Sequence, residues 1–239
     1  MRIAIVSDIH GNLTAFEAVL ADLRGSSPDI ILHGGDLAEA GPRPCEVVDC
    51  IRGLGWRGVV GNTDEMLFRP QSLSEFGARA PKLAPLVAAL GEMSAWAQQA
   101  LGAERLDWLR GLPGTLVERP VALVHASPGD LWRAPAHDAA DAELESTYAP
   151  LGQPVAVHGH IHRPYVRGLG CVTVANSGSV SMSYDGDCRA SYLVVDEGRP
   201  AVRRVEYDVE REIRACFDSG MPHADWVARI LRAGAPQPL

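Results

Sequence analysis

The chain contains 239 residues, a length that fits one large domain or two small ones. Apolar residues make up 46% and charged residues 22%, which excludes a disordered, collagen-like or coiled-coil chain. Lys and Arg number 22 against 30 Asp and Glu, and this formal net charge of −8 argues against long nucleic acids and anionic membranes as partners.

The first third of the sequence alternates apolar strands with amphipathic helices. Strands are expected at 2–7, 29–33 and 59–60, and helices at 13–23 and 44–54. Asn12 is the expected N-cap of the first helix, and Pro44 suits the first position of the second. The order β-α-β-α-β predicts a parallel sheet with helices packed against it.

The rest of the chain continues in one domain, which we assign to residues 1–239. Residues 72–112 are rich in Ala and Leu and predict two or three helices, an insertion that would form a cap over the substrate pocket. Short strands are expected at 114–118, 121–125, 155–157, 171–175, 191–195 and 201–205, and terminal helices at 210–218 and 224–231. The Pro-rich tail 234–239 is expected to fray.

No window of the sequence approaches the roughly 18 uninterrupted apolar residues that cross a membrane. The apolar run at 3–6 is too short for the core of a signal peptide. The five cysteines include no C-x-x-C pair and are interpreted as reduced, buried thiols. These features predict a cytoplasmic protein without a membrane partner, and they leave a homo-oligomer open.

Five polar clusters interrupt the apolar runs, each where a strand gives way to a loop. They are Asp8-Ile9-His10, Gly35-Asp36, Gly61-Asn62-Thr63-Asp64, His125, and Gly159-His160-Ile161-His162. In open α/β sheets, binding sites gather outside the carboxyl ends of the strands. We therefore expect these clusters to meet at one edge.

The clusters supply seven candidate metal ligands: Asp8, His10, Asp36, Asn62, His125, His160 and His162. One ion takes three or four protein ligands, so seven donors suit two ions that share a bridging carboxylate. Imidazole and carboxylate without thiolate favour Mn, Fe, Ni, Co or Zn. Each residue taken alone also has a structural reading, as a helix cap, a hydrogen-bonded histidine or a turn glycine.

The ordered combination D-x-H, G-D, G-N-x-D, H and G-H-x-H resembles the calcineurin-like metallophosphoesterase superfamily. SDIHGNLTAFEAVL at Ser7–Leu20 and GDLAEAGPRPCEVVD at Gly35–Asp49 are similar to its small bacterial and archaeal phosphodiesterase branch. His33 in HGGD and NSGSV at Asn176–Val180 fit the same branch. The motifs span about three quarters of the chain, from Asp8 to Val180.

This resemblance implies a four-layer α/β/β/α sandwich with a dimetal site at the carboxyl edge of the central sheets. Asp8, His10 and His162 would hold the first metal and Asn62, His125 and His160 the second, with Asp36 bridging. Two divalent transition-metal ions, Mn²⁺ first, would generate a bridging hydroxide that attacks phosphorus. Asp36 and Asn62 would be catalytic, and Asn12, Asn62 and His125 would contact the substrate phosphate.

One position departs from the superfamily pattern. Many members have His after G-N, and that His is thought to protonate the leaving group; here the residue is Thr63. No general acid is therefore assigned, and His33, His125 and Asp64 stay open as helpers. His158 lies outside the G-H-x-H pair, so it is interpreted as structural.

The leading functional interpretation is a metal-dependent phosphoesterase that hydrolyses diester or monoester bonds of small phosphorylated molecules, with nucleotides favoured. Cleavage of a dinucleoside polyphosphate such as diadenosine tetraphosphate is the alternative reaction. A binding scaffold that has kept the fold but lost the reaction is the alternative of a different class. The complete donor set favours an enzyme over that scaffold.

Overall fold

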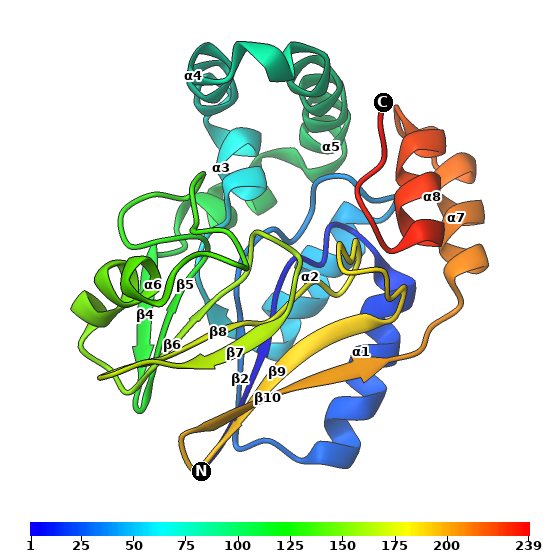
Figure 1. Ribbon diagram of the computed structural model, residues 1–239. Coiled ribbons are helices and arrows are strands. Elements are labelled where there is room, and N and C mark those ends of the chain that lie inside the picture. The colour runs from blue at the N-terminus through cyan, green and yellow to red at the C-terminus, as the bar shows by residue number, and fades with distance from the viewer.

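The computed structural model describes residues 1–239 and contains two five-stranded sheets (Figure 1). The first sheet contains, in spatial order, β10 (Arg199–Val205), β9 (Ala190–Asp196), β1 (Arg2–Val6), β2 (Ile30–His33) and β3 (Arg57–Gly58). The second contains β4 (Thr115–Glu118), β5 (Val121–Val124), β6 (Val155–His158), β8 (Thr173–Asn176) and β7 (Tyr165–Gly168). The α-helices are α1 (Leu13–Ser26), α2 (Pro44–Leu54), α3 (Asn62–Phe68), α4 (Gln71–Arg79), α5 (Ala84–Arg110), α6 (Asp141–Tyr148), α7 (Val209–Asp218) and α8 (Ala224–Ala233), and the 3-10 turns are η1 (Pro81–Leu83) and η2 (Ala149–Leu151).

Both sheets are mixed, with a parallel centre. β1, β2 and β3 run parallel, as the β-α-β-α-β pattern predicts, and β9 joins β1 in the antiparallel direction. In the second sheet β5, β6 and β8 are parallel, with β4 and β7 antiparallel at the edges. The parallel strands of each sheet therefore deliver their carboxyl ends to one edge.

The sheets pack face to face through an apolar layer, and helices cover the outer faces. Ile3 and Ile5 of β1 point into this layer, where they pack with residues such as Val157 of β6. The alternate residues of β1 face the other way, against α1 and α2. On the far side, α6 packs on the second sheet. The predicted four-layer α/β/β/α sandwich is confirmed, and burial of β1 on both faces explains its unbroken apolar sequence.

The helical segment between the sheets stands above their shared edge (Figure 1). It contains α4, η1 and α5 where two or three helices are expected, and α5 is interrupted at Gly102, whose φ is 70°. Ala97, Leu101 and Leu109 of α5 enter the core beside α1 and α2. The segment is thus anchored in the main domain by its second half.

Four local expectations are wrong. β3 lies at Arg57–Gly58 instead of 59–60, because the Val60 amide leaves the ladder to bond Pro113 O at 3.0 Å. β7 is absent from the predicted strands because it has no apolar run: as an edge strand, it alternates half-buried and exposed residues. The tail is packed instead of frayed: the Trp226 indole donates to Gln237 O at 2.9 Å. The five cysteines are all free, but of these Cys216 alone is buried.

Candidate metal centre

The seven predicted donors all lie on loops that leave the carboxyl ends of parallel strands. Asp8 and His10 follow β1, Asp36 follows β2, Asn62 opens α3 after β3, His125 follows β5, and His160 and His162 follow β6. The first three strands belong to one sheet and the last two to the other. The donors therefore converge where the two sheets meet, and the contacts below link all seven.

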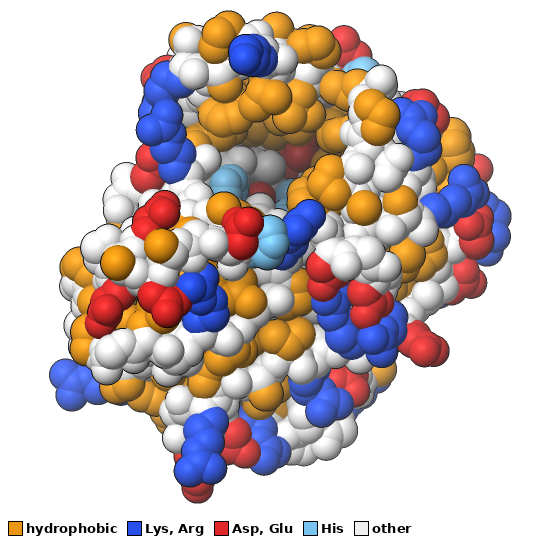
Figure 2. Space-filling model, in the orientation of Figure 1, with side chains coloured by type: hydrophobic (Ala, Val, Ile, Leu, Met, Phe, Trp, Pro, Cys, Tyr) orange, Lys and Arg blue, Asp and Glu red, His pale blue; other side chains and the backbone are white.

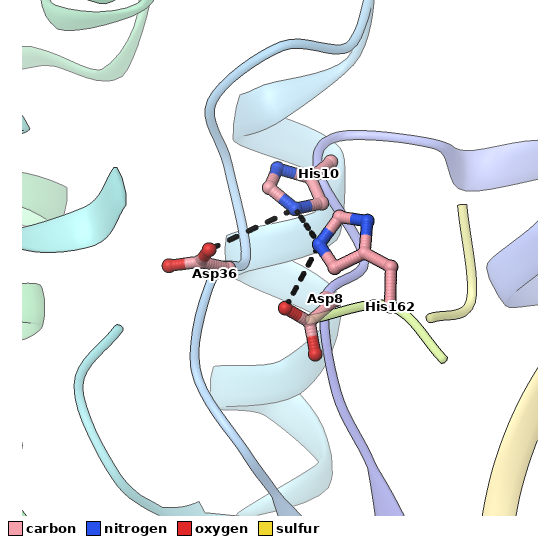
Figure 3. A group of neighbouring side chains, drawn as sticks. All are labelled: Asp8, His10, Asp36 and His162. Atoms are coloured by element: carbon pink, nitrogen blue, oxygen red, sulfur yellow. Dashed lines mark hydrogen bonds and ion pairs between the residues drawn. The ribbon is translucent and has the colours of Figure 1, made fainter. Parts of the chain in front are cut away.

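Four of the donors form one compact group (Figure 3). Each of Asp8, His10, Asp36 and His162 offers a ligand atom, and these atoms all lie within 4.8 Å of one another. The Nε2 atoms of His10 and His162 are 3.2 Å apart, and His162 Nε2 is 3.1 Å from Asp8 Oδ1. All four residues are buried.

The other three donors form a second group that also contacts Asp36. His125 Nε2 lies 3.3 Å from Asp36 Oδ2 and 2.9 Å from Asn62 Oδ1. His160 Nδ1 lies 2.9 Å from the same Asn62 oxygen. Asp36 Oδ2 is also 3.8 Å from His10 Nε2, so this carboxylate belongs to both groups.

Backbone carbonyls orient three of the imidazoles. Nδ1 of His10 bonds Glu39 O at 2.9 Å, Nδ1 of His125 bonds Gly34 O at 2.8 Å, and Nδ1 of His162 bonds Met182 O at 2.6 Å. A carbonyl only accepts, so each Nδ1 carries a proton, and in the neutral form of each ring, the form that binds a metal, the lone pair of Nε2 faces the carboxylates. Lone pairs then face lone pairs, an arrangement that a divalent cation satisfies and that is typical of histidine metal ligands.

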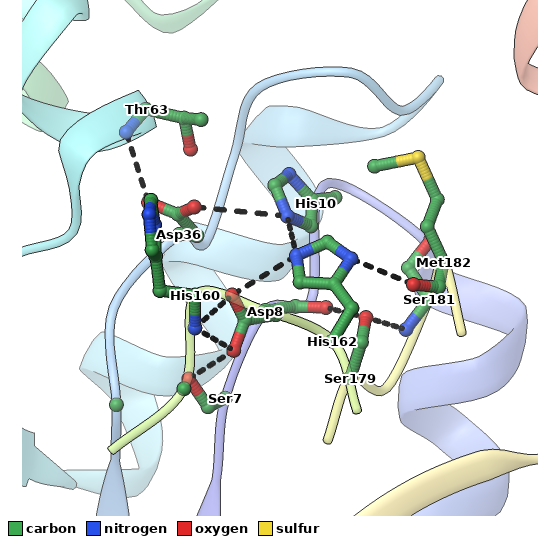
Figure 4. A network of polar contacts seen from close by, with 12 residues as sticks. Ser7, Asp8, His10, Asp36, Thr63, His160, His162, Ser179, Ser181 and Met182 are labelled. Carbon is green, nitrogen blue, oxygen red and sulfur yellow. Dashed lines mark hydrogen bonds and ion pairs between the residues drawn. The ribbon is translucent and has the colours of Figure 1, made fainter. Parts of the chain in front are cut away.

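The two carboxylates are held in place by short polar contacts (Figure 4). Ser7 Oγ donates to Asp8 Oδ2 at 2.6 Å, and the His160 amide donates to Asp8 Oδ1 at 3.1 Å. The Thr63 amide donates to Asp36 Oδ1 at 2.9 Å. Asp36 keeps Oδ2 for the cluster, and Asp8 Oδ1 faces His162 Nε2 while it also accepts from the His160 amide. The orientation of both carboxylates is therefore fixed before any ligand arrives.

Five of the donors have a left-handed backbone. The φ angles are 57° at Asp8, 49° at His10, 54° at Asp36, 67° at His160 and 55° at His162. This conformation costs about 1–2 kcal/mol for an ordinary L-residue, and Asp and His are among the residues that adopt it most often. Hydrogen bonds between the first two loops hold it, such as His10 N to Asp36 O at 3.0 Å. Backbone strain concentrated on one set of side chains is typical of a functional site.

The electrostatics of the cluster favour positive charge. Burial opposes ionisation of Asp36, but the facing His125 and His10 outweigh it and hold the pKa of that carboxyl below its usual range. Burial likewise disfavours the charged form of His125, yet Asp36 prevails and raises the pKa of the imidazole to about 9. A pocket whose carboxylates stay ionised and stabilise a neighbouring cation suits a divalent metal ion.

Two polar residues next to the predicted donors, His158 and Asp64, have structural roles in the fold. His158 stacks on Tyr148 with ring centroids 4.9 Å apart and bonds the Tyr165 hydroxyl at 2.8 Å, which agrees with its structural interpretation. Asp64 accepts from the amides of Asp36 at 2.8 Å and Leu37 at 2.9 Å. Asp64 therefore shapes the loop that carries Asp36.

Asn12 caps α1, as its sequence position predicts. Its Oδ1 accepts from the Ala15 amide at 2.9 Å, and its Nδ2 lies 3.2 Å from Ser181 Oγ. Asn12 is buried and does not line the cavity described below. Its contact with the substrate phosphate stays a prediction.

Glu39 is a buried carboxyl that the sequence reasoning missed. It lies three residues beyond Asp36, lines the cavity, and neither of its carboxyl oxygens has a hydrogen-bond partner. Burial, together with Asp36 and Asp64, raises the pKa of Glu39 well above its ordinary value. The only sequence signal was its closeness to the G-D motif.

His33, one of the open candidates for a proton donor, lies in the core and not in the cavity. It is fully buried, and neither ring nitrogen has a partner. Burial lowers its pKa to about 4, from 6.5. Below pH 6.5 the unfolded chain binds a proton on this ring, whereas the folded chain does so only near pH 4. His33 therefore lowers the free energy of unfolding as the pH falls from 6.5 toward 4.

We therefore expect the metal-free wild-type protein to lose about 2 kcal/mol more unfolding free energy between pH 7 and pH 5 than His33→Leu does. Urea titrations at both pH values, in the presence of a chelator, measure this difference. Equal losses of unfolding free energy in the two proteins would show that the pKa of His33 is not lowered in the folded state.

A cavity of about 670 Å³ opens onto the cluster (Figure 2). Five of the seven donors line it, namely His10, Asp36, Asn62, His160 and His162. In the space-filling view, His and acidic side chains lie at the floor of the hollow, beneath hydrophobic side chains. These five donors are thus reachable from outside, as a catalytic metal site requires.

None of the helices combines the length and the apolar composition needed to traverse a lipid bilayer. α5 is the longest, with 27 residues, and its sequence includes Glu92, Glu104 and Arg105.

Comparison with known proteins finds relatives over almost the whole chain. The uncharacterized protein MJ0912 of Methanocaldococcus jannaschii is 29% identical, over 97% of this chain and 98% of that protein. The crystal structure of a metallophosphoesterase from Sphaerobacter thermophilus is 28% identical with a TM-score of 0.79, and covers 98% of this chain and 99% of that one. The hypothetical protein PH1004 from Pyrococcus horikoshii OT3 shares the fold, with a TM-score of 0.84 at 19% identity and 99% coverage of both chains.

The family comparison agrees with the geometry. The calcineurin-like phosphoesterase superfamily domain matches residues 1–199. This range contains every donor of the cluster, from Asp8 to His162. The chain therefore belongs to the calcineurin-like phosphoesterase superfamily and is a metallophosphoesterase, a hydrolase of phosphoric esters.

Proposed function

We propose that the protein is a dinuclear phosphoesterase that hydrolyses diester or monoester bonds of small phosphorylated molecules. The observation that carries the proposal is the position of Asp36, whose Oδ2 lies 3.8 Å from His10 Nε2 and 3.3 Å from His125 Nε2. A carboxylate shared by two groups of donors is the arrangement that two neighbouring cations need.

In this proposal Asp8, His10 and His162 hold one ion, Asn62, His125 and His160 hold the second, and Asp36 contacts both. When bound, two divalent ions, Mn²⁺ first among Fe, Ni, Co and Zn, would supply an activated water and offset the charge of the phosphoryl oxygens.

The chain's own groups position the ester. Asn62 lines the cavity, and its amide oxygen is held between His125 and His160; in this proposal its nitrogen donates to a phosphoryl oxygen. The Thr63 amide keeps Asp36 fixed while the phosphate is bound. Six of the seven donors are buried, all but His160, and burial strengthens the charge–charge contacts among them.

We also propose that the helical segment 72–112 acts as the cap of the pocket. Leu86 and Leu90 of α5 line the cavity, while the later part of α5 is anchored in the core. This division supports a segment that shapes the pocket and is at the same time part of the fold. The cytoplasmic location stays a prediction, to which the five free thiols add support.

The test is metal-dependent turnover together with metal content. We expect protein loaded with Mn²⁺ to bind two ions per chain and to hydrolyse bis(p-nitrophenyl) phosphate, with turnover lost after chelation and recovered on adding metal. Metal content after gel filtration and p-nitrophenolate release measure the two quantities. One bound ion would contradict the dinuclear assignment, and two ions without turnover would favour the binding scaffold.

A further inference from the structure

The cavity above the metal centre has a polar floor and apolar walls. Its floor carries the polar donors, and its walls are formed by two helical parts of the chain that are far apart in sequence (Figures 1 and 2). One wall comes from η1 and the start of α5, through Leu83, Leu86 and Leu90. Another part of the wall comes from α8, through Trp226 and Ile230, which belong to the apolar cluster against which Leu86 and Leu90 pack.

The C-terminal wall is fixed in position. The Trp226 indole donates to Gln237 O at 2.9 Å, and Arg229 Nη2 donates to Pro238 O at 3.0 Å. These bonds hold the tail along α8, where Pro236 and Pro238 also line the cavity. The wall is therefore formed before a ligand binds, as in most small-molecule sites.

Few positive charges lie along this cavity. No arginine lines it, and Lys82, the only lysine of the chain, is its one ammonium group. A polyphosphate chain carries several charges, which proteins usually match with clustered Arg and Lys or with metal ions. Metal ions at the floor can neutralise the charge of one phosphoryl group. The walls have no cluster of positive side chains that could neutralise further phosphates.

We propose that the substrate is an ester with one phosphoryl group and a large apolar alkyl or aryl part. The phosphoryl group lies over the His and Asp floor, and the apolar part lies along the wall that Leu86, Leu90 and Trp226 contribute. This inference rests on the proposed function and disfavours diadenosine tetraphosphate as the substrate. Each methylene group buried in such a site contributes about 0.8 kcal/mol, so chain length should govern recognition.

A series of p-nitrophenyl phosphodiesters whose second ester group is methyl, butyl or octyl tests the inference on the Mn²⁺-loaded enzyme. We expect kcat/KM to rise at least about 10-fold from methyl to octyl, mainly through a lower KM. A flat or falling series, or a higher kcat/KM for diadenosine tetraphosphate than for the octyl ester, would overturn it. Absence of turnover with every ester, including bis(p-nitrophenyl) phosphate, would instead overturn the proposed function.

A variant of the wall gives a second test. Leu83 lines the cavity and is 40% exposed, so Leu83→Glu places a charge in the wall with little risk to folding. We expect it to reduce the octyl-to-methyl ratio of kcat/KM at least about 3-fold. The matched control is Phe217→Glu on α7, outside the cavity and 55% exposed, which should leave the ratio unchanged. Equal ratios in the two variants would contradict the assignment of this wall.

Binding can be followed without turnover. Lys82 is the only lysine, so acetylation by acetic anhydride reports on the cavity rim, while the amino group of Met1 serves as an internal control at the other end of the molecule (Figure 1). We expect octylphosphonate to slow acetylation of Lys82 at least about 3-fold relative to methylphosphonate, with Met1 unaffected, as measured by mass spectrometry. Equal protection by the two phosphonates would count against an apolar subsite.

Discussion

Asp36→Asn is expected to lower turnover of bis(p-nitrophenyl) phosphate at least about 100-fold and to weaken metal binding at both positions. Replacing a residue that only supports a metal ligand already costs 10–100-fold, and Asp36 faces both donor groups directly. Asparagine keeps the shape and can still accept from the Thr63 amide through Oδ1. Its NH₂ group would then replace the charged oxygen between His10 and His125.

The measurements are metal content, calorimetric titration with Mn²⁺, and p-nitrophenolate release. The matched control is Asp107→Asn on α5, an exposed carboxylate paired with Arg110, which should change none of the three measurements. Wild-type metal content and turnover in Asp36→Asn would show that Asp36 does not bridge.

The second large effect is expected at Gly61. A Cβ on this residue would overlap the Asp36 carboxylate and would lie only 2.8 Å from its Cγ. The backbone there is extended, with φ −100° and ψ 172°, so alanine can adopt the conformation and the cost comes from the collision alone. We expect Gly61→Ala to displace Asp36, reduce turnover at least about 100-fold, and destabilise the fold by about 1–3 kcal/mol.

Gly53→Ala is the control for this substitution. Gly53 lies in α2, and a Cβ there would meet nothing within 4 Å. Alanine should therefore stabilise the helix by about 0.5–1 kcal/mol and leave turnover unchanged. Thermal unfolding and metal content distinguish the two variants; a fully active Gly61→Ala would mean that the Asp36 loop yields without loss of the metal centre.

The edge of the sheet where the donors gather could be predicted because each donor directly follows an apolar strand. Chain direction then places Asp8, Asp36 and His125 at the carboxyl ends of parallel strands, and the structure brings them together. The four-layer fold followed from the family motifs. Local periodicity alone would not have shown that two sheets face each other, because that depends on contacts distant in sequence.

The features that could not be predicted are those set by tertiary contacts. The sequence GNTD does not show that α3 begins at Asn62. It also does not show whether Gly61 is needed for a turn or because a neighbouring residue leaves no room for a side chain. The left-handed backbone at Asp8 and His10 depends on hydrogen bonds to the loop of Asp36. The unpartnered carboxyl of Glu39 is recognisable only once its surroundings are known.

The packed tail has a practical consequence for the handling of this protein. Leu239 lines the cavity and lies beside α8, whereas Met1 lies at the opposite end of the sandwich (Figure 1). An affinity tag or fluorescent fusion joined after Leu239 would start at the entrance used by ligands and would compete with them for space. The same tag before Met1 would leave that entrance clear, so purification and screening should use amino-terminal fusions.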